Sequence, residues 1–204
     1  MNLLGSKTIE TDRLILRATI ESDLKLLWKI LCIPEVNKYY LTSKLSPNWN
    51  EEKKWQYEKL RSANDIDKFQ WSIVLKDNNE CIGQISVHEA HDEDESINDK
   101  NIRGIGWFIN PSYQRNGYAT EAATAILDYM FNNVKISEII TKAAIDNPAS
   151  WKLMEKLGFV KRTNELSLIK YTFLDNPVEA YSYEITKEKY DENNKLRRYK
   201  HDIN

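Results

Sequence analysis

Apolar residues recur along this chain with two different periods, and those periods predict its elements. Alternating or continuous apolar positions predict strands over 14–16, 69–75, 81–87, 102–109, 136–145, 166–173 and 178–185. Spacings of three and four residues predict helices over 24–31, from 48–52 to 61, and over 119–130. Strands and helices in this order are typical of an α+β fold.

Capping residues indicate where several helices begin and end. Asn147 suits an N-cap, Pro148 suits the first helical position, and Gly158 suits the C-terminal stop of a short helix between them. Ser22 or Asp23 is expected to cap the first helix, and Thr186 a last one. The polar tract 91–95 is too hydrophilic for a core, so we interpret it as a solvated hairpin loop whose acids are surface charge or attract a cationic acceptor.

The loop Gln114-Arg115-Asn116-Gly117-Tyr118-Ala119 joins the predicted strand 102–109 to the predicted helix 119–130. Backbone N–H groups at a helix start lack intrahelical partners, and the helix dipole adds partial positive charge there. Gly117 lets the backbone approach a ligand closely. The loop is therefore predicted to hold a pyrophosphate through its main chain.

Composition and charge limit the classes of protein that this chain can belong to. Its 204 residues suit one domain, predicted over 1–186, with a short helical and basic extension over 187–204. The 29 basic and 31 acidic residues give a formal charge of −2, which argues against a nucleic-acid or membrane partner. Cys32 and Cys81 lack metal-ligand spacing, so we expect no disulfide and no metal site. No run reaches membrane-spanning length, and we expect a cytoplasmic protein.

The loop carries a family resemblance. Gln114 to Ala119 resembles the acetyl-CoA loop Q/R-x-x-G-x-G/A of the GNAT superfamily of N-acetyltransferases. Asn147-Pro148-Ala149-Ser150, with Glu155-Lys156-Leu157-Gly158-Phe159, is similar to the second half of the same signature, and residues 11–17 resemble its first strand. The resemblance covers residues about 10 to 186, and it is strongest to the subgroup containing the ribosomal-protein N-terminal alanine and serine acetyltransferases.

This resemblance implies a fold and a co-substrate. The fold is a mixed, mostly antiparallel sheet, splayed between its fourth and fifth strands and flanked by helices. Acetyl-CoA is the implied donor, with its pantetheine arm pairing like a strand with Phe108 and Ile109 and also contacting Asn147 and Ser150. The implied pyrophosphate contacts are Gln114, Arg115, Asn116, Gly117, Tyr118, Ala119 and Thr120. Arg115 either adds a charged contact or is a solvated loop arginine, and Gln114 is expected to shape the loop.

Acyl transfer to an amine needs a base, an oxyanion donor and a proton source for the leaving thiolate. Many relatives place a tyrosine seven residues after Asn147, but this chain has Met154 there, which cannot donate a proton. Ser150 becomes the candidate, unless it only bonds the backbone of the helix start. The N–H of Phe108 or Ile109 is the candidate oxyanion donor. Glu89, flanked by His88 and close to His91, is the candidate base, and the alternative is that it is only a solvated hairpin carboxylate.

The predicted function is transfer of an acetyl group from acetyl-CoA to a primary amine of a small molecule or a protein N-terminus, in a direct ternary complex. Arg103 stands where relatives often have a carboxylate or a small residue, and Lys170-Tyr171 stand near where some relatives have a glutamate. These two departures argue against assuming a ribosomal-protein substrate and favour an anionic or carboxylate-bearing acceptor. An alternative is a CoA-binding sensor or partner protein with a degenerate site. Nucleic-acid binding through the basic residues 195–200 has little support from overall charge. Trp49, Trp55 and Tyr57 suit either the core or a homodimer contact, so oligomeric state stays open.

Overall fold

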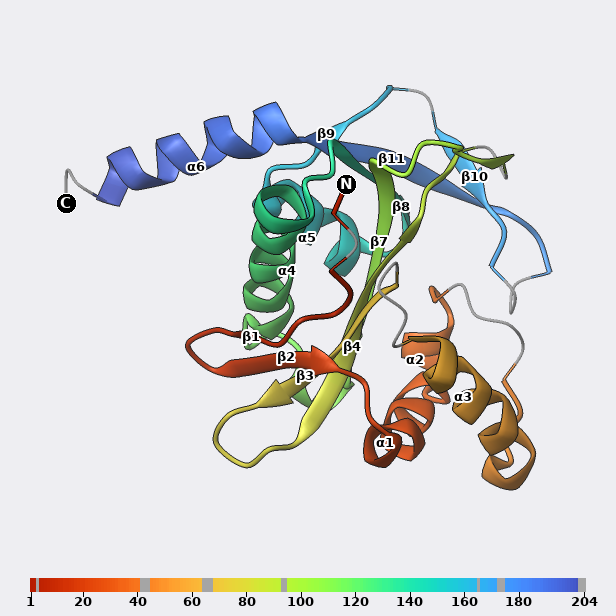
Figure 1. The fold of residues 1–204 in the computed structure, drawn as a ribbon. Helices are drawn as coiled ribbons and strands as arrows, with labels where there is room; N and C mark the ends of the chain where they lie inside the picture. The colour runs from red at the N-terminus through yellow and green to blue at the C-terminus, as the bar shows by residue number, and fades with distance from the viewer. Residues whose placement is uncertain are drawn as a thin grey trace.

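A nine-stranded sheet forms the centre of the protein (Figure 1). The structure is a computed structural model that describes residues 1–2, 4–40, 45–63, 68–92, 95–164, 166–171 and 175–201. The strands are β1 (Ile9–Glu10), β2 (Leu14–Ala18), β3 (Phe69–Leu75), β4 (Cys81–Glu89), β5 (His91–Asp92), β6 (Glu95–Ser96), β7 (Ile102–Ile109), β8 (Glu138–Ala144), β9 (Val160–Lys161), β10 (Ser167–Ile169) and β11 (Val178–Thr186). The helices are α1 (Glu21–Leu31), α2 (Pro34–Asn37), α3 (Trp49–Ala63), η1 (Pro111–Tyr113), α4 (Tyr118–Asp128), η2 (Tyr129–Val134), α5 (Pro148–Leu157) and α6 (Lys187–His201).

The order of strands in the sheet is β1-β2-β3-β4-β7-β8-β11-β10, with β9 also paired to β11. Each of these pairs is antiparallel except β7 with β8, which is parallel. β5 and β6 form a separate two-stranded hairpin. The predicted mixed, mostly antiparallel α+β sheet is confirmed.

The parallel pair β7 and β8 separates partway along its length. Their residues pair only from Ile102 with Glu138 to Gly104 with Ile140, although β7 continues to Ile109 and β8 to Ala144. Just beyond the last pair, the hydroxyl of Thr141 donates to the carbonyl of Ile105 at 3.0 Å. The sheet is therefore split from this point onward. β7 and β8 correspond to the fourth and fifth strands predicted from the sequence, 102–109 and 136–145, so the split lies where the resemblance implied.

Helices cover both faces of the sheet. α4 and α5 pack on one face, where Ile85, Ile105 and Ile139 join a core with Ile126. α1 packs on the other face, where Phe108 and Val74 join a second core with Leu27. Because side chains alternate along a strand, neighbouring residues of β4, β7 and β8 point to opposite faces. Which face a residue occupies decides whether it can take part in the site.

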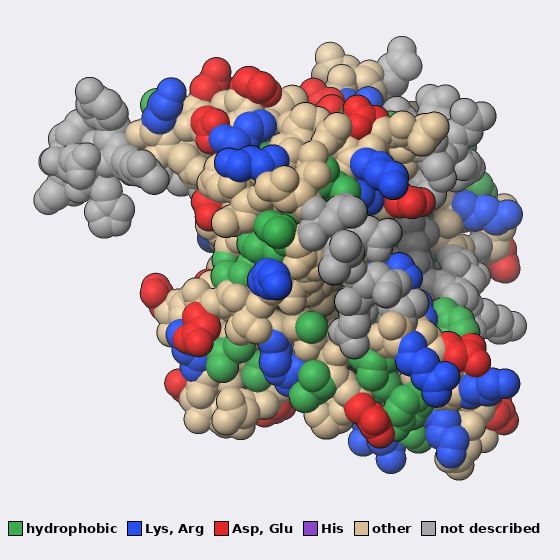
Figure 2. All heavy atoms as spheres, viewed as in Figure 1, with side chains coloured by type: hydrophobic (Ala, Val, Ile, Leu, Met, Phe, Trp, Pro, Cys, Tyr) green, Lys and Arg blue, Asp and Glu red, His purple; other side chains and the backbone are tan. Residues whose placement is uncertain are grey.

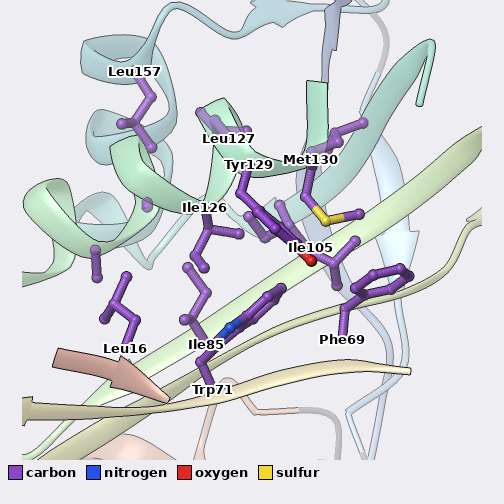
Figure 3. Packing of buried hydrophobic residues seen from close by; sticks show 14 of the residues in the cluster. Leu16, Phe69, Trp71, Ile85, Ile105, Ile126, Leu127, Tyr129, Met130 and Leu157 are labelled. Atoms are coloured by element: carbon purple, nitrogen blue, oxygen red, sulfur yellow. The ribbon is translucent and has the colours of Figure 1, made fainter. Parts of the chain in front are cut away.

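Trp71 lies at the centre of the larger core (Figure 3). Its indole is fully buried, stacks on Phe69 with ring centroids 6.2 Å apart, and meets the edge of Tyr129 at 5.8 Å. Full burial of a large apolar side chain contributes about 1.5–3 kcal/mol. This core fixes α4 against the sheet, and so fixes where α4 begins.

Most predicted elements are confirmed, with local differences. The first helix begins at Glu21, so Asp23 is inside it, and its carboxylate accepts the N–H of Ile20 at 3.1 Å from the third helical position. The N-cap prediction for Ser22 or Asp23 was wrong by this shift. Thr186 does cap α6, accepting the N–H of Lys189 at 3.2 Å. In the tract 91–95, Glu93 and Asp94 lie outside the described residues, as do 172–173 of the predicted strand 166–173.

The C-terminal helix α6 projects from the body of the protein (Figure 1). Its first turn still packs on the body, because Tyr190 is buried and stacks on Phe131 with centroids 5.0 Å apart. The boundary between 1–186 and 187–204 stays a prediction. Within the described ranges, no helix has the length and apolar character to cross a bilayer. Basic and acidic side chains intermingle over the face in Figure 2.

Candidate active site

The loop between β7 and α4 forms a cradle of outward backbone N–H groups. Arg115 and Gly117 both adopt left-handed backbone angles, with φ of 66° and 82°. The Gln114 amide donates to the carbonyl of Ile109 at 3.0 Å, and the Asn116 amide donates to the carbonyls of Tyr113 and Gln114 at 3.2 and 3.1 Å. In the described part of the chain, the N–H groups of 115–120 have no acceptor. This geometry suits an anion at the start of α4.

Arg13 fastens the outer side of this cradle. Its guanidinium donates to the carbonyl of Asn116 at 3.0 Å, contacts the carboxylate of Glu121 at 2.7 Å, and lies 4.5 Å from the ring centroid of Tyr118. Burial would raise the pKa of Glu121, but hydrogen bonds from Thr11 and Arg13 outweigh it and lower that pKa. Glu121 is thus an anion in the first turn of α4, and Arg13 offsets its repulsion of a bound phosphate.

Where β7 and β8 separate, the backbone groups of alternate β7 residues point into the gap between the two strands. The carbonyl of Ile105 faces β8, so the main-chain groups of Trp107 and Ile109 face the split. Phe108 faces the other way, since a Cβ built on Gly83 of β4 would lie 2.2 Å from the Phe108 oxygen. Of the two predicted oxyanion donors, only the N–H of Ile109 therefore points into the split.

A cavity of about 1260 Å³ joins the cradle, the split and the space beneath α1–α3. The segment 38–40 bridges the two arms of the split. Tyr40 meets Phe108 of β7 edge-on at 5.0 Å, while Tyr39 meets Tyr171 at 6.0 Å and donates to the carbonyl of Asp146 at 3.1 Å. Burial raises the pKa of Tyr171 to about 12. Tyr39 and Tyr40 therefore line the cavity and contact residues on opposite arms of the split.

Asn147 and Ser150 lie at the start of α5, on the wall of the same cavity. The side-chain oxygen of Asn147 accepts the N–H of Ser150 at 3.4 Å, which makes Asn147 the N-cap. The Ser150 hydroxyl is half-buried, and it makes no hydrogen bond to any described residue. Met154, one turn further, is 2 % exposed and also reaches the cavity.

Residues 13–160 match the family model of the acetyltransferase (GNAT) domain. The chain belongs to the GNAT acetyltransferase family. It is 30 % identical over 186 residues to the uncharacterized N-acetyltransferase YoaA of Bacillus subtilis, covering 88 % of this chain and 96 % of that one.

Solved structures of other GNAT proteins share the fold. Spermidine N-acetyltransferase from Vibrio cholerae, in complex with CoA and spermine, aligns with a TM-score of 0.70 at 18 % identity, over 88 % of this chain and 99 % of that one. Ribosomal-protein-S5-alanine acetyltransferase from Vibrio fischeri aligns with a TM-score of 0.68 at 18 % identity, over 91 % of this chain and 99 % of that one.

The GNAT fold does not bring Glu89 into the cavity. Ile85 and Val87 of β4 point into the core under α4. Side chains alternate along a strand, so Glu89, two residues after Val87, lies on the same face. It is exposed at the strand end and does not line the cavity. The geometry therefore does not support Glu89 as the base.

Arg103 lies opposite Glu89 in the register of this GNAT sheet and shares its face. Its guanidinium is buried, donating to the carbonyl of Lys100 at 3.1 Å and lying 3.2 Å from the sulfur of Met1. It does not line the cavity, so its position gives no support for a carboxylate-bearing acceptor. Among the residues that the structure describes, no group of three or more His, Cys, Asp or Glu side chains could hold a metal.

Sequence reasoning missed the other face of β4. Gln84, Ser86 and His88 alternate with Ile85 and Val87, and all three line the cavity. They make a polar floor on the side of the sheet away from α4. The period-two spacing was a usable signal, because polar residues at alternate positions of a central strand need either solvent or a site.

Proposed function

We propose that this GNAT protein transfers the acetyl group of acetyl-CoA to a primary amine of a small molecule or a protein N-terminus, in a direct ternary complex. The observation that carries the proposal is one cavity that connects an anion cradle, a split sheet edge and a polar floor. The cradle and the polar floor line the same cavity, so a donor and an acceptor bound there would meet directly, which suits direct transfer.

The described residues fit the co-substrate. The N–H groups of 115–120 suit its pyrophosphate, and the left-handed Gly117 permits close approach. The main-chain groups of Trp107 and the N–H of Ile109 are positioned to pair with the amides of a pantetheine arm, as an added strand would. Asn147 and Ser150 face that arm from α5.

Two residues are placed to act on the reacting groups. The N–H of Ile109 stabilises negative charge on the thioester oxygen. The Ser150 hydroxyl donates a hydrogen bond to the departing sulfur, in place of the tyrosine that Met154 replaces. Asn147 supports Ser150 by capping the helix that carries it.

The charges of the cavity favour an acceptor that carries an anionic group over a polyamine. Among described residues, the charged side chains that line the cavity from α2, α3, β8 and the residues after β10 are one glutamate and three lysines: Glu35, Lys59, Lys142 and Lys170. A protonated polyamine would meet more like charge than opposite charge there. The carboxylate of an amino acid would instead meet more opposite charge than like charge.

Thiol release from acetyl-CoA tests the proposal with four acceptors: serine, an alanyl tetrapeptide, glucosamine and spermidine. We expect acceptor-dependent release, confirmed by mass spectrometry of the N-acetyl product, with serine or the tetrapeptide ahead of spermidine. Tight coenzyme binding without release for any acceptor would instead indicate a CoA-binding sensor. Fastest turnover of spermidine would contradict the charge argument while leaving the transferase proposal intact.

A further inference from the structure

His88 continues the polar floor of β4 to the point where the sheet splits. It pairs in register with Gly104 of β7, and Gly104 pairs with Ile140 of β8, the last pair before the split. The side chain of His88 lines the cavity, on the face opposite to Glu89. It therefore lies beside the place where the two arms of the sheet part.

Two glycines on β7 make room for the imidazole. A Cβ built on Gly104 would lie 2.3 Å from Cε1 and 2.7 Å from Nδ1 of His88, so the ring rests directly on the Gly104 backbone. A Cβ built on Gly106 would lie 3.9 Å from Nε2, and no closer atom is present among the described residues. The ring thus extends across β7 with Nε2 toward Gly106, which itself has no side chain.

A backbone hydrogen bond fixes the tautomer of the neutral ring. Nδ1 of His88 lies 2.8 Å from the carbonyl oxygen of Glu89. A carbonyl can only accept, so Nδ1 carries the hydrogen and Nε2 carries the lone pair. The nitrogen that can accept a proton is therefore the one directed over Gly106.

We infer that His88 is the proton acceptor in acetyl transfer, with Nε2 as the basic atom. This inference rests on the proposed function and adds the base that Glu89 does not supply. The acceptor nitrogen bonds to the acetyl carbon while the carbon–sulfur bond breaks. One proton passes from that nitrogen to Nε2 of His88. The thiolate takes one proton from solvent on the side of the cavity that Ser150 lines, and the products are the amide and the free thiol. The proton on Nε2 returns to solvent, which restores the base.

Other titratable groups face this part of the cavity from each packed element, and they enter any pH profile. Among the described residues they are Glu35 on α2, Tyr39 and Tyr40 after it, Lys59 on α3, Lys142 on β8, and Lys170 and Tyr171 after β10. Lysine and tyrosine normally titrate several units above histidine, and glutamate below it. Burial lowers the pKa of Lys59, so the loss of the step near neutrality in His88→Gln, and not its position alone, identifies the imidazole. The acceptor amine itself adds a separate step at about 7.7–8.0 when it is an α-amine.

The test compares His88→Gln, His88→Ala and Glu89→Gln with the wild type, using the alanyl tetrapeptide and serine as acceptors. We expect His88→Gln to lower kcat by about 100- to 10,000-fold, the usual contribution of a general base. The Kd for acetyl-CoA is expected to stay within about twofold, since the cradle is untouched. Imidazole in the buffer should partly restore His88→Ala, and the kcat step near pH 6 to 7 should vanish in His88→Gln while the amine step stays.

Each contrary outcome has a distinct meaning. Near-normal kcat in His88→Gln, with a large loss in Glu89→Gln, would overturn the inference and restore Glu89 as base. Loss of acetyl-CoA binding and of thermal stability in both His88 variants, without imidazole rescue, would assign a structural role and also overturn it. A folded wild type that binds acetyl-CoA but releases no thiol with any of the four acceptors would remove the proposed function, and the base with it.

Discussion

Arg13 and Glu121 lie 108 positions apart in the sequence, yet the Arg13 guanidinium contacts the Glu121 carboxylate at 2.7 Å. The same carboxylate accepts the Arg13 backbone N–H at 2.8 Å and the Thr11 hydroxyl at 2.6 Å. The entry to β2 is thereby bound to the first turn of α4. Because Arg13 also holds the carbonyl of Asn116, one side chain links the sheet, the loop and the helix that form the cradle.

Removing this link should lower the affinity for acetyl-CoA more than it lowers the stability of the fold. We expect Arg13→Ala to raise the Kd for acetyl-CoA by about tenfold or more, because a hydrogen bond to a charged group contributes about 1.5–3 kcal/mol. Calorimetric titration measures the change. Arg13→Lys keeps the charge but not the planar fork, so it should restore only part of the affinity.

A double variant tests whether Arg13 acts by offsetting the charge of Glu121. If it does, Arg13→Ala combined with Glu121→Gln binds acetyl-CoA more tightly than Arg13→Ala alone. Equal affinities for the two variants would show that Arg13 acts only by holding the loop carbonyl.

Gly117 should tolerate no branched side chain. Its φ of 82° is a left-handed conformation, which strains a β-branched residue by about 1–3 kcal/mol. Gly117→Val is expected to abolish detectable acetyl-CoA binding in calorimetry while leaving the far-UV circular dichroism unchanged. Gly158→Ala is a matched control, since Gly158 also has positive φ, at 98°, but caps α5 at its far end. It should lower the melting temperature without a comparable loss of affinity.

Asn147 has a capping role and a proposed coenzyme role, and one substitution separates them. Aspartate caps a helix as well as asparagine does, but it lacks the amide N–H donors. Asn147→Asp should therefore keep the melting temperature and raise the KM for acetyl-CoA. Asn147→Ala should also lose about 0.5–2 kcal/mol of stability. An unchanged KM in Asn147→Asp would limit Asn147 to capping.

Asp23 should make the fold sensitive to acid. Its burial would raise the carboxyl pKa, but hydrogen bonds from Arg17, Ile20 and Ser72 lower it below the ordinary 3.8. A depressed folded-state pKa stabilises the protein above the unfolded value, and this contribution is lost as the pH falls through the folded value. The free energy of unfolding in urea should thus drop below about pH 4.

The variant Asp23→Asn isolates this contribution. At pH 7 it should be less stable by about 3–5 kcal/mol, because Arg17 then lacks its buried partner. The difference from the wild type should shrink as the pH falls below the ordinary pKa of Asp23. A difference that is constant with pH would exclude linkage to this carboxyl.

The parts of the site that the sequence predicts are those built from neighbouring residues. The cradle at Gly117 and the cap at Asn147 follow from local conformation, so a short motif is enough to place them. The Arg13 clamp and the Tyr39 and Tyr40 bridge depend on contacts across more than 60 positions, which no local pattern specifies. Glu89 and His88 lie on opposite faces of β4, and a short motif does not specify which face holds the site because helices cover both faces of this sheet.

Hydrogen exchange measured with and without acetyl-CoA tests the central claim most directly. We predict that the coenzyme slows exchange of the backbone N–H groups of 115–120 and of Trp107 and Ile109, which have no strand or helix partner among the residues that the structure describes. Protection elsewhere, with these groups exchanging as fast as in the free protein, would contradict it.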